Sequence, residues 1–192
     1  SGAGMEPEST GGPDFSLAGN GAMVPGAGRG IGAEIALALA AQGADIIVAD
    51  RTLAETEGTA GAVKALGRRA IRAEGDLLDV GAIRTMVAKA DAEAGRIDIL
   101  VNNAGLNITQ FAEDVTEAAW DTVLGVNLKA VFFCSQAVGK LMIARKGGKI
   151  INVSSQAGVR GNDGGHIAHY CVAKAGIAEY TRLLAGELGP HS

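Results

Sequence analysis

Five short apolar runs alternate along the chain with longer segments of helical periodicity, and this alternation restricts the fold more than any other feature. The runs are GAMV, ADIIVAD, RAIRAEG, IDILVNNAG and GKIINVSS, all within residues 21–155. Several of the intervening segments end in glycine, as helix C-termini commonly do. Right-handed crossovers between parallel strands would place helices on both faces of the sheet. The sequence therefore predicts a three-layer α/β fold with a doubly wound parallel sheet and ligands at the strands' carboxyl ends.

Length and composition indicate a single globular domain. Of the 192 residues, 47% are hydrophobic and 20% are charged, which is enough for a large core. Residues 1–20 are rich in Gly, Pro and Ser and lack a secretory signal pattern, so we expect a flexible arm followed by one domain over residues 21–192. No strand follows the helical segment at residues 169–192, which would leave the last sheet edge uncovered. We therefore expect the domain to be incomplete at its C-terminus.

The charge and the cysteines restrict the possible partners. A net charge of -4 and a pI near 5.4 provide no basic field for nucleic acid or an anionic membrane, so we expect neither as a partner. The apolar region at residues 35–50 is interrupted by Gln, Gly and Asp, and we expect no membrane-spanning run. Cys134 and Cys171 have no metal-ligand or disulfide spacing, which predicts no metal site and a cytoplasmic location. Small molecules are the expected partners.

A glycine-rich turn, PGAGRGIG, follows the first apolar run directly and opens the first helical segment. Glycines allow the backbone to turn tightly and approach a pyrophosphate, while N-H groups at the helix start bind the anion. Gly26, Gly30 and Gly32 give the spacing G-x-x-x-G-x-G, and a P-loop is excluded because Gly-Lys-Ser/Thr is missing. A merely flexible loop is the weaker interpretation in this strand-turn-helix context. We expect a dinucleotide to contact Gly26, Gly28, Arg29, Gly30, Ile31 and Gly32.

Acidic residues follow the second and third apolar runs. Asp50 ends the second run 24 positions after Gly26, where a carboxylate can bind the adenosine ribose hydroxyls. Because a carboxylate repels a 2'-phosphate, Asp50 favours NAD, although the neighbouring Arg51 could bind that phosphate and Asp50 could be a plain turn residue. Asp76 and Leu77 follow the third run, where Asp76 could contact the adenine or simply form a turn.

Tyr170 and Lys174 are separated by one helical turn in YCVAK, so they lie on the same helix face. A phenol is ordinarily a weak acid, but an adjacent ammonium stabilises the phenolate and makes a usable general acid and base. The fifth run ends in NVSS, and a hydroxyl there could bind a substrate carbonyl, with Ser155 preferred over Ser154. Each residue alone could be structural. Together with the glycine turn they indicate a catalytic site.

These motifs resemble the short-chain dehydrogenase/reductase family from about Ala22 to the end of the chain. The resemblance includes the glycine turn, NNAG at residues 102–105, VNLKA with Asn127, INVSS with Ser155, and Y-x-x-x-K. It implies a Rossmann-like fold whose usual seven strands are incomplete here, and assembly as a homodimer or homotetramer. Pro25 departs from the family pattern, which usually has Thr before the first glycine, and removes a backbone donor.

The resemblance also implies roles for individual residues. Tyr170 would exchange the proton, Ser155 would position the substrate oxygen, and Lys174 would also bind the nicotinamide ribose. Asn127 would hold a water in a proton relay. The adenosine side of the cofactor would be lined by Asn103, Ala104 and Gly105. The implied reaction is hydride transfer between NAD(H) and a secondary alcohol or ketone of the sugar, polyol or 3-oxoacyl type. The alternative is a dinucleotide-binding module without turnover, or an inactive fragment of such an enzyme.

Overall fold

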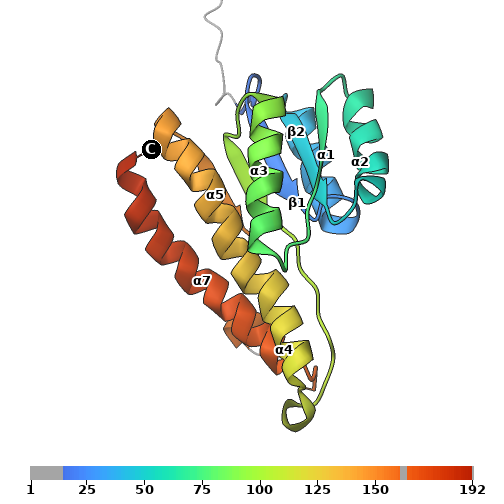
Figure 1. Ribbon diagram of the computed structural model, residues 1–192, viewed down its shortest axis with the longest axis vertical. Coiled ribbons are helices and arrows are strands. Elements are labelled where there is room, and N and C mark those ends of the chain that lie inside the picture. Colours follow the sequence, from blue (N-terminus) through green and yellow to red (C-terminus); the bar gives the residue numbers. More distant parts are fainter. Residues whose placement is uncertain (1–14, 161–163, 192) are drawn as a thin grey trace, which may run out of the picture.

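The computed structural model describes residues 15–160 and 164–191 and contains one sheet of five parallel strands. The strand order is β3-β2-β1-β4-β5, so successive strands lead outward from β1 first in one direction and then in the other. This arrangement confirms the doubly wound α/β fold expected from the sequence (Figure 1). The strands are β1 Gly21–Pro25, β2 Asp45–Asp50, β3 Ala70–Glu74, β4 Ile99–Asn102 and β5 Lys149–Asn152.

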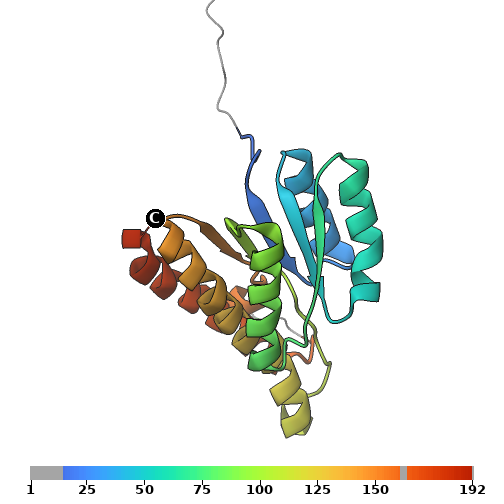
Figure 2. The same cartoon turned by 45° about the horizontal axis from the view of Figure 1, so that its top comes forward.

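Helices cover both faces of the sheet, as Figure 2 shows. Helices α1 and α2 contribute to the core on one face, and α3 and α5 contribute to the core on the other. Helix α7 runs beside α5 (Figure 1). The helices are α1 Gly30–Ala41, α2 Leu53–Ala65, α3 Val80–Ala94, α4 Glu117–Leu124, α5 Ala130–Arg145, α6 Ala157–Arg160 and α7 Ala168–Leu188, with short turns η1 Ala112–Asp114, η2 Gly125–Lys129 and η3 Gly189–His191.

The central strands supply the two cores with alternating side chains. Met23 of β1 and Ile47 of β2 face α3 and α5, whereas Val24 and Val48 face α1 and α2. All of β1 is buried, because helices cover both of its faces and strands flank both of its edges. Strand β5 alternates between exposed and half-buried residues, as expected of a strand at the sheet edge.

The longest apolar helix comprises α4, η2 and α5, which continue one another over Glu117–Arg145. Within the described ranges this is the helix that is long and apolar enough to cross a membrane, with a mean hydropathy of 1.3, and half of the apolar window is buried inside the protein. The expectation that no run would meet this test is therefore wrong. Burial explains the composition, since Ala130, Cys134, Val138 and Met142 all lie in the core between α5 and the sheet. Core helices pass the same test, so the evidence for a membrane span is weak.

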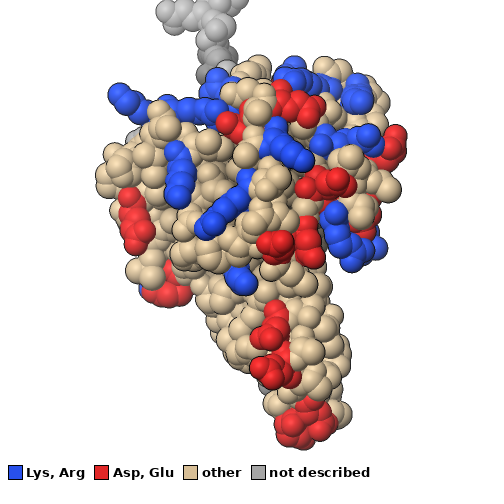
Figure 3. Space-filling model, in the orientation of Figure 1, with Lys and Arg blue, Asp and Glu red and all other residues tan. Residues whose placement is uncertain are grey.

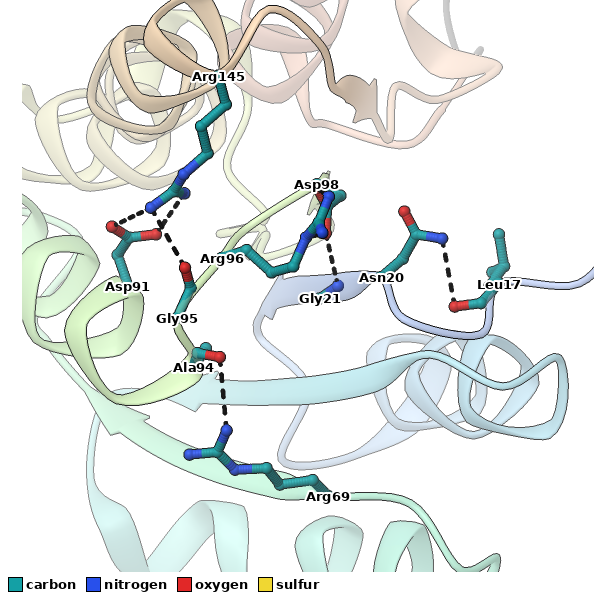
Figure 4. Close-up of polar contacts among 10 residues, drawn as sticks. All are labelled: Leu17, Asn20, Gly21, Arg69, Asp91, Ala94, Gly95, Arg96, Asp98 and Arg145. Atoms are coloured by element: carbon teal, nitrogen blue, oxygen red, sulfur yellow. Dashed lines mark hydrogen bonds and ion pairs between the residues drawn. The ribbon is translucent and has the colours of Figure 1, made fainter.

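Polar contacts at the amino ends of β1 and β4 fix these two strands relative to one another (Figure 4). Asp98, which precedes β4, accepts a 2.8 Å hydrogen bond from the Gly21 backbone N-H and two 2.7 Å hydrogen bonds from Arg96. Nearby, Arg145 of α5 forms two hydrogen bonds to Asp91 of α3. The contacts of Asp98 lie at the opposite ends of the strands from the glycine turn after β1, and they join β1 to the start of β4.

The structure describes only the last part of the expected N-terminal arm, from residue 15 on. Residues 1–14 of the expected arm lie outside the described residues, while Leu17 packs against the α1 and α2 core and donates its N-H to the Gln42 carbonyl at 2.7 Å. Figure 3 shows Lys and Arg intermixed with Asp and Glu on the face that it displays. Neither sign of charge forms a continuous stripe across that face.

Candidate active site

A cleft of about 920 Å³ lies at the carboxyl ends of the strands, extending from Asp50 and Asp76 at one end to Tyr170 and Lys174 at the other. It crosses the point between β1 and β4 where the strand order reverses, which is the usual ligand site of doubly wound sheets. The sequence-predicted residues that line it are Gly26, Arg29, Gly30, Ile31, Gly32, Asp50, Arg51, Asp76, Leu77, Asn103, Ala104, Gly105, Ser155, Tyr170 and Lys174. The fold thus brings together residues that are far apart in the sequence.

The glycine turn has the open shape that a pyrophosphate requires. Gly26 has a φ of 77°, and a Cβ there would lie 2.8 Å from the Ala104 Cα, so only glycine fits. Gly30 begins α1 with a φ of 58°, and among the described residues nothing lies within 4 Å of the position a Cβ would take. Gly30, Ile31 and Gly32, the first residues of α1, line the cleft, and a helix start in this position fits the phosphates of a dinucleotide.

Gly28 lies behind this turn, although the sequence analysis expected it to contact the cofactor. Its N-H donates to Asp50 Oδ2 at 2.9 Å, while the other oxygen of Asp50 accepts the Arg51 N-H at 2.9 Å. A side chain at position 28 would lie 2.5 Å from the Glu55 carbonyl of α2. Gly28 therefore allows α2 to approach the turn, and Asp50 is held with both oxygens engaged at the end of β2.

Pro25 occupies the last position of β1. The following N-H, from Gly26, donates to the Ala49 carbonyl of β2 at 2.8 Å. Because successive residues of a strand bond to opposite neighbours, the Pro25 nitrogen faces β4. The pairing of β1 with β4 involves Ala22 and Met23, so the missing donor of Pro25 lies beyond the last paired residue. This placement explains how the sheet accommodates a proline here.

The NNAG segment connects β4 to the turn and to the neighbouring strand. Asn102 is buried and donates to Ser135 Oγ at 2.9 Å and to Asn152 Oδ1 at 2.8 Å, which links β4 to α5 and β5. Asn103 donates to the Gly26 carbonyl at 3.1 Å and so holds the glycine turn against the end of β4. Both asparagines therefore stabilise the floor of the cleft.

Asn127 lies in η2, a π-helical turn between α4 and α5, a type of distortion that is frequent at functional sites. Its side chain is fully buried and donates to the Leu106 and Val123 carbonyls at 2.7 and 2.8 Å. Its Oδ1 has no partner among the described residues. A Cβ at Gly105 would lie 2.8 Å from this oxygen and 3.6 Å from Lys174 Nζ, so both atoms flank Gly105. An unpaired acceptor in this position fits a bound water.

Lys174 and Tyr170 extend from adjacent turns of α7 into the end of the cleft opposite Asp50. Lys174 is buried, its Nζ donates to the Val153 carbonyl at 2.8 Å, and the same atom lies 5.7 Å from the centroid of the Tyr170 ring. Burial lowers the pKa of Lys174 below its ordinary value of 10.5. The ammonium is therefore held in place beside the phenol, where it can stabilise a phenolate electrostatically.

The two serines after β5 have different contacts. Ser154 Oγ donates to the Lys174 carbonyl at 2.7 Å and so connects this segment to α7. Ser155 Oγ accepts the Ala157 N-H at 3.2 Å, at the start of α6, which leaves its own hydroxyl hydrogen available. Both serines line the cleft. This difference supports the sequence preference for Ser155 as the residue that binds a substrate oxygen.

Several residues of the cleft wall belong to none of the predicted motifs, among them Leu78, Asn107 and Glu55. Thr52 and Glu55 do have the T-x-x-E spacing of a capping box, which predicts the start of a helix at this point. The structure contains that capping box at the start of α2. Leu78 and Asn107 lie in connections whose course the sequence does not reveal.

The chain is similar to several known proteins over most of its length. It is 48% identical over 170 residues to the short-chain reductase protein NovJ of Streptomyces niveus, covering 88% of this chain and 64% of NovJ. It is 42% identical over 179 residues to the 2-dehydro-3-deoxy-D-gluconate 5-dehydrogenase of Escherichia coli (strain K12), covering 93% of this chain and 69% of that enzyme. The chain thus spans about two thirds of the length of these relatives.

Its structure also resembles that of a gluconate 5-dehydrogenase from Burkholderia cenocepacia J2315 in complex with NADP and tartrate. The TM-score is 0.88 at 33% sequence identity, covering 93% of this chain and 69% of the other. The profile of the family described as "short chain dehydrogenase" matches residues 20–192. The chain therefore belongs to the short-chain dehydrogenase family, as its motifs indicated.

Proposed function

We propose that this chain carries the site of an oxidoreductase that transfers a hydride between NAD(H) and a secondary alcohol or its ketone. The observation that carries this proposal is the position of the buried Lys174 ammonium beside the Tyr170 ring, at the opposite end of the same cleft from the glycine turn. A nicotinamide dinucleotide, when bound, supplies the hydride acceptor or donor. The protein contributes orientation, proton transfer and electrostatic stabilisation.

Tyr170 exchanges the proton with the substrate oxygen in this proposal. Lys174, held by the Val153 carbonyl, stabilises the phenolate that remains after the proton leaves. The Ser155 hydroxyl donates to the substrate oxygen and keeps it next to Tyr170. Asn127 binds a water through its unpaired Oδ1 and connects the Lys174 side of the site to solvent. General acid-base catalysis of this kind typically contributes about 10² to 10⁴ in rate.

The proposed cofactor preference is for NAD over NADP. Asp50 supports it, because its carboxylate is fixed at the end of β2 by the Gly28 and Arg51 N-H groups. A fixed negative charge at this end of the cleft binds ribose hydroxyls and repels a 2'-phosphate. The structure of the Burkholderia cenocepacia relative is in complex with NADP, so the fold itself does not exclude a 2'-phosphate. We therefore attribute the proposed preference to residues at the adenosine end.

The proposed substrate is a small polar alcohol or ketone of the sugar, polyol or 3-oxoacyl type. The similarity to an enzyme named 2-dehydro-3-deoxy-D-gluconate 5-dehydrogenase supports a sugar derivative.

For the whole protein we propose a cytoplasmic homodimer or homotetramer. Trp120 and Phe132 are 41% and 44% exposed on α4 and α5, which provides apolar surface for subunit contacts.

Titration of the chain with NADH and with NADPH, followed by nucleotide fluorescence, tests the binding half of the proposal. Single-turnover oxidation of NADH with a panel of sugar ketones and 3-oxoacyl thioesters tests the chemical half. Saturable nucleotide binding together with turnover of a substrate supports the proposed oxidoreductase. Binding without turnover across the panel instead supports a dinucleotide-binding module, which is the second candidate because Pro25 stands where the family usually has a donor and hydroxyl. Absence of binding contradicts both functions for this chain.

A further inference from the structure

Arg51 and Glu55 form an ion pair on the cleft wall beside Asp50. The Arg51 Nη2 lies 3.2 Å from Glu55 Oε1. The other oxygen, Glu55 Oε2, accepts the Thr52 backbone N-H and the Thr52 hydroxyl, each at 3.0 Å. Both oxygens of Glu55 are therefore engaged, one in the capping box of α2 and one with the guanidinium that follows Asp50.

The backbone of Glu55 is fixed relative to the glycine turn as well. The position of a Cβ at Gly28 would be 2.5 Å from the Glu55 carbonyl, so the first turn of α2 lies directly against the phosphate-binding turn. One helical turn further on, Thr59 Oγ1 donates to the Gly28 carbonyl at 3.4 Å. These contacts fix the first turns of α2 against the glycine turn, and the ion pair and capping box fix the Glu55 carboxylate on that helix.

The charges at this end of the cleft oppose a phosphate. Arg51 follows Asp50, the proposed ribose-binding residue; its backbone N-H donates to Asp50 Oδ1, while its guanidinium pairs with Glu55. A 2'-phosphate would have to compete with Glu55 for the guanidinium and would also lie close to two negative groups. Arg29 lines the cleft too, but it belongs to the glycine turn and is the same in every variant considered below.

From these contacts we infer that Glu55 is a second determinant of cofactor choice, which occupies the Arg51 guanidinium and thereby disfavours dinucleotides that carry a 2'-phosphate. This inference rests on the proposed function, because it refers to the adenosine end of the proposed dinucleotide site. Asp50 acts by its own charge at the ribose. Glu55 acts through Arg51 and explains why an arginine in this position does not by itself favour NADPH.

The test is a fluorescence titration of Glu55→Gln with NADH and with NADPH at low ionic strength. Glutamine preserves the capping box, so α2 keeps its start, and thermal unfolding checks this. Because the ion pair is exposed, with 73% of the Arg51 side chain accessible, we expect the NADPH affinity to rise roughly two- to fivefold relative to that for NADH. The NADH affinity is expected to change by less than about twofold.

Two further variants separate this mechanism from a general charge effect. Glu57→Gln makes the same charge change on α2, at a residue that pairs with Arg72 instead, and should leave the NADPH to NADH ratio unchanged. Arg51→Ala combined with Glu55→Gln should lose the gain in NADPH affinity, because the released guanidinium is missing.

The possible outcomes distinguish the inference from the proposed function. If NADH binds but Glu55→Gln leaves the ratio unchanged, or if Glu57→Gln shifts it equally, the inference is wrong and the proposed function stands. If the gain persists without Arg51, the guanidinium is not the mediator and the inference is also wrong. If neither nucleotide binds to wild type or variants, the proposed function fails and the inference fails with it.

Discussion

The Lys174 ammonium lies 5.7 Å from the centroid of the Tyr170 ring and donates to the Val153 carbonyl at 2.8 Å. Both residues extend from α7, and the Val153 carbonyl, in the segment after β5, fixes the ammonium beside the phenol. The geometry of the pair therefore depends on two segments that meet only in the folded protein.

Replacement of Tyr170 by phenylalanine should abolish proton exchange while keeping the shape of the cleft. We expect turnover to fall by about 10² to 10⁴ and the NADH affinity to stay within about twofold. Single-turnover kinetics with the best substrate of the panel, together with NADH titration, measure the two effects. Turnover equal to that of wild type would contradict the role of Tyr170.

Alanine variants of Ser154 and Ser155 should have different effects on turnover in the same assay. Ser155→Ala removes the hydroxyl proposed to hold the substrate oxygen and should lower turnover by about 10² or more, with little change in NADH affinity. Ser154→Ala removes the hydrogen bond to the Lys174 carbonyl and should act mainly on stability. A larger loss of turnover in Ser154→Ala than in Ser155→Ala would reverse the assignment.

Lys174 should give the stability of the protein a pH dependence. Burial lowers its pKa below 10.5, so between the folded-state pKa and about 10.5 the unfolded chain binds more protons than the folded one. The free energy of unfolding, relative to that of Lys174→Met, should therefore rise as the pH increases toward 10.5. Urea denaturation of both proteins across this range measures the difference.

Lys174→Arg serves as the control for that experiment, because arginine remains protonated throughout the range. Its unfolding free energy relative to Lys174→Met should show no such rise. A wild-type difference that stays constant or falls with pH would show that burial does not lower the pKa of Lys174 in the folded protein.

Asn102 should be important for stability, because its amide donates to Ser135 on α5 and to Asn152 on β5. Asn102→Ala leaves these buried acceptors without a donor, at an expected cost of about 1 to 3 kcal/mol in the free energy of unfolding. Urea denaturation measures this. Asn107→Ala, at an exposed position of the cleft wall, should change stability by less than about 0.5 kcal/mol, and equal losses would contradict the argument.

Cys134 and Cys171 should differ in their reactivity toward thiol reagents. Burial in the α5 core raises the pKa of Cys134 to about 12, so at mildly alkaline pH the folded protein exposes almost no thiolate there. We expect Cys171, which is half-buried on α7, to be alkylated first, and Cys134 to react only on unfolding. Mass spectrometry of peptides from the native and denatured protein provides the measurement. Modification of native Cys134 at a rate equal to that of Cys171 would contradict its burial.

Local patterns in the sequence were sufficient to predict the strands, the glycine turn and the adjacency of Tyr170 and Lys174. The strands correspond to short apolar runs, the adjacency of Tyr170 and Lys174 to the helical period of about 3.6 residues, and the turn to glycines. The strand order and the cleft at the reversal point then follow from the rules for parallel sheets. The five-stranded sheet agrees with that expectation.

The remaining features depend on contacts between distant segments, which no local pattern encodes. Gly28 is positioned behind the turn because α2 approaches it, and Glu55 reaches the cleft wall for the same reason. The π-helical turn around Asn127 changes the helical register within a segment that reads as one continuous helix. The same helix is apolar because it packs in the core, which a search for uninterrupted apolar runs does not reveal.

The hydrogen bonds between Asp98, Gly21 and Arg96 have a consequence for how this fold tolerates change. They anchor β1 and β4 at the amino ends of these strands, while the cleft lies at the carboxyl ends. Substitutions of Arg96 or Asp98 would change how firmly the two strands are joined without replacing a residue that lines the cleft. The stability of the scaffold can therefore be adjusted at the amino ends while the lining of the cleft stays the same.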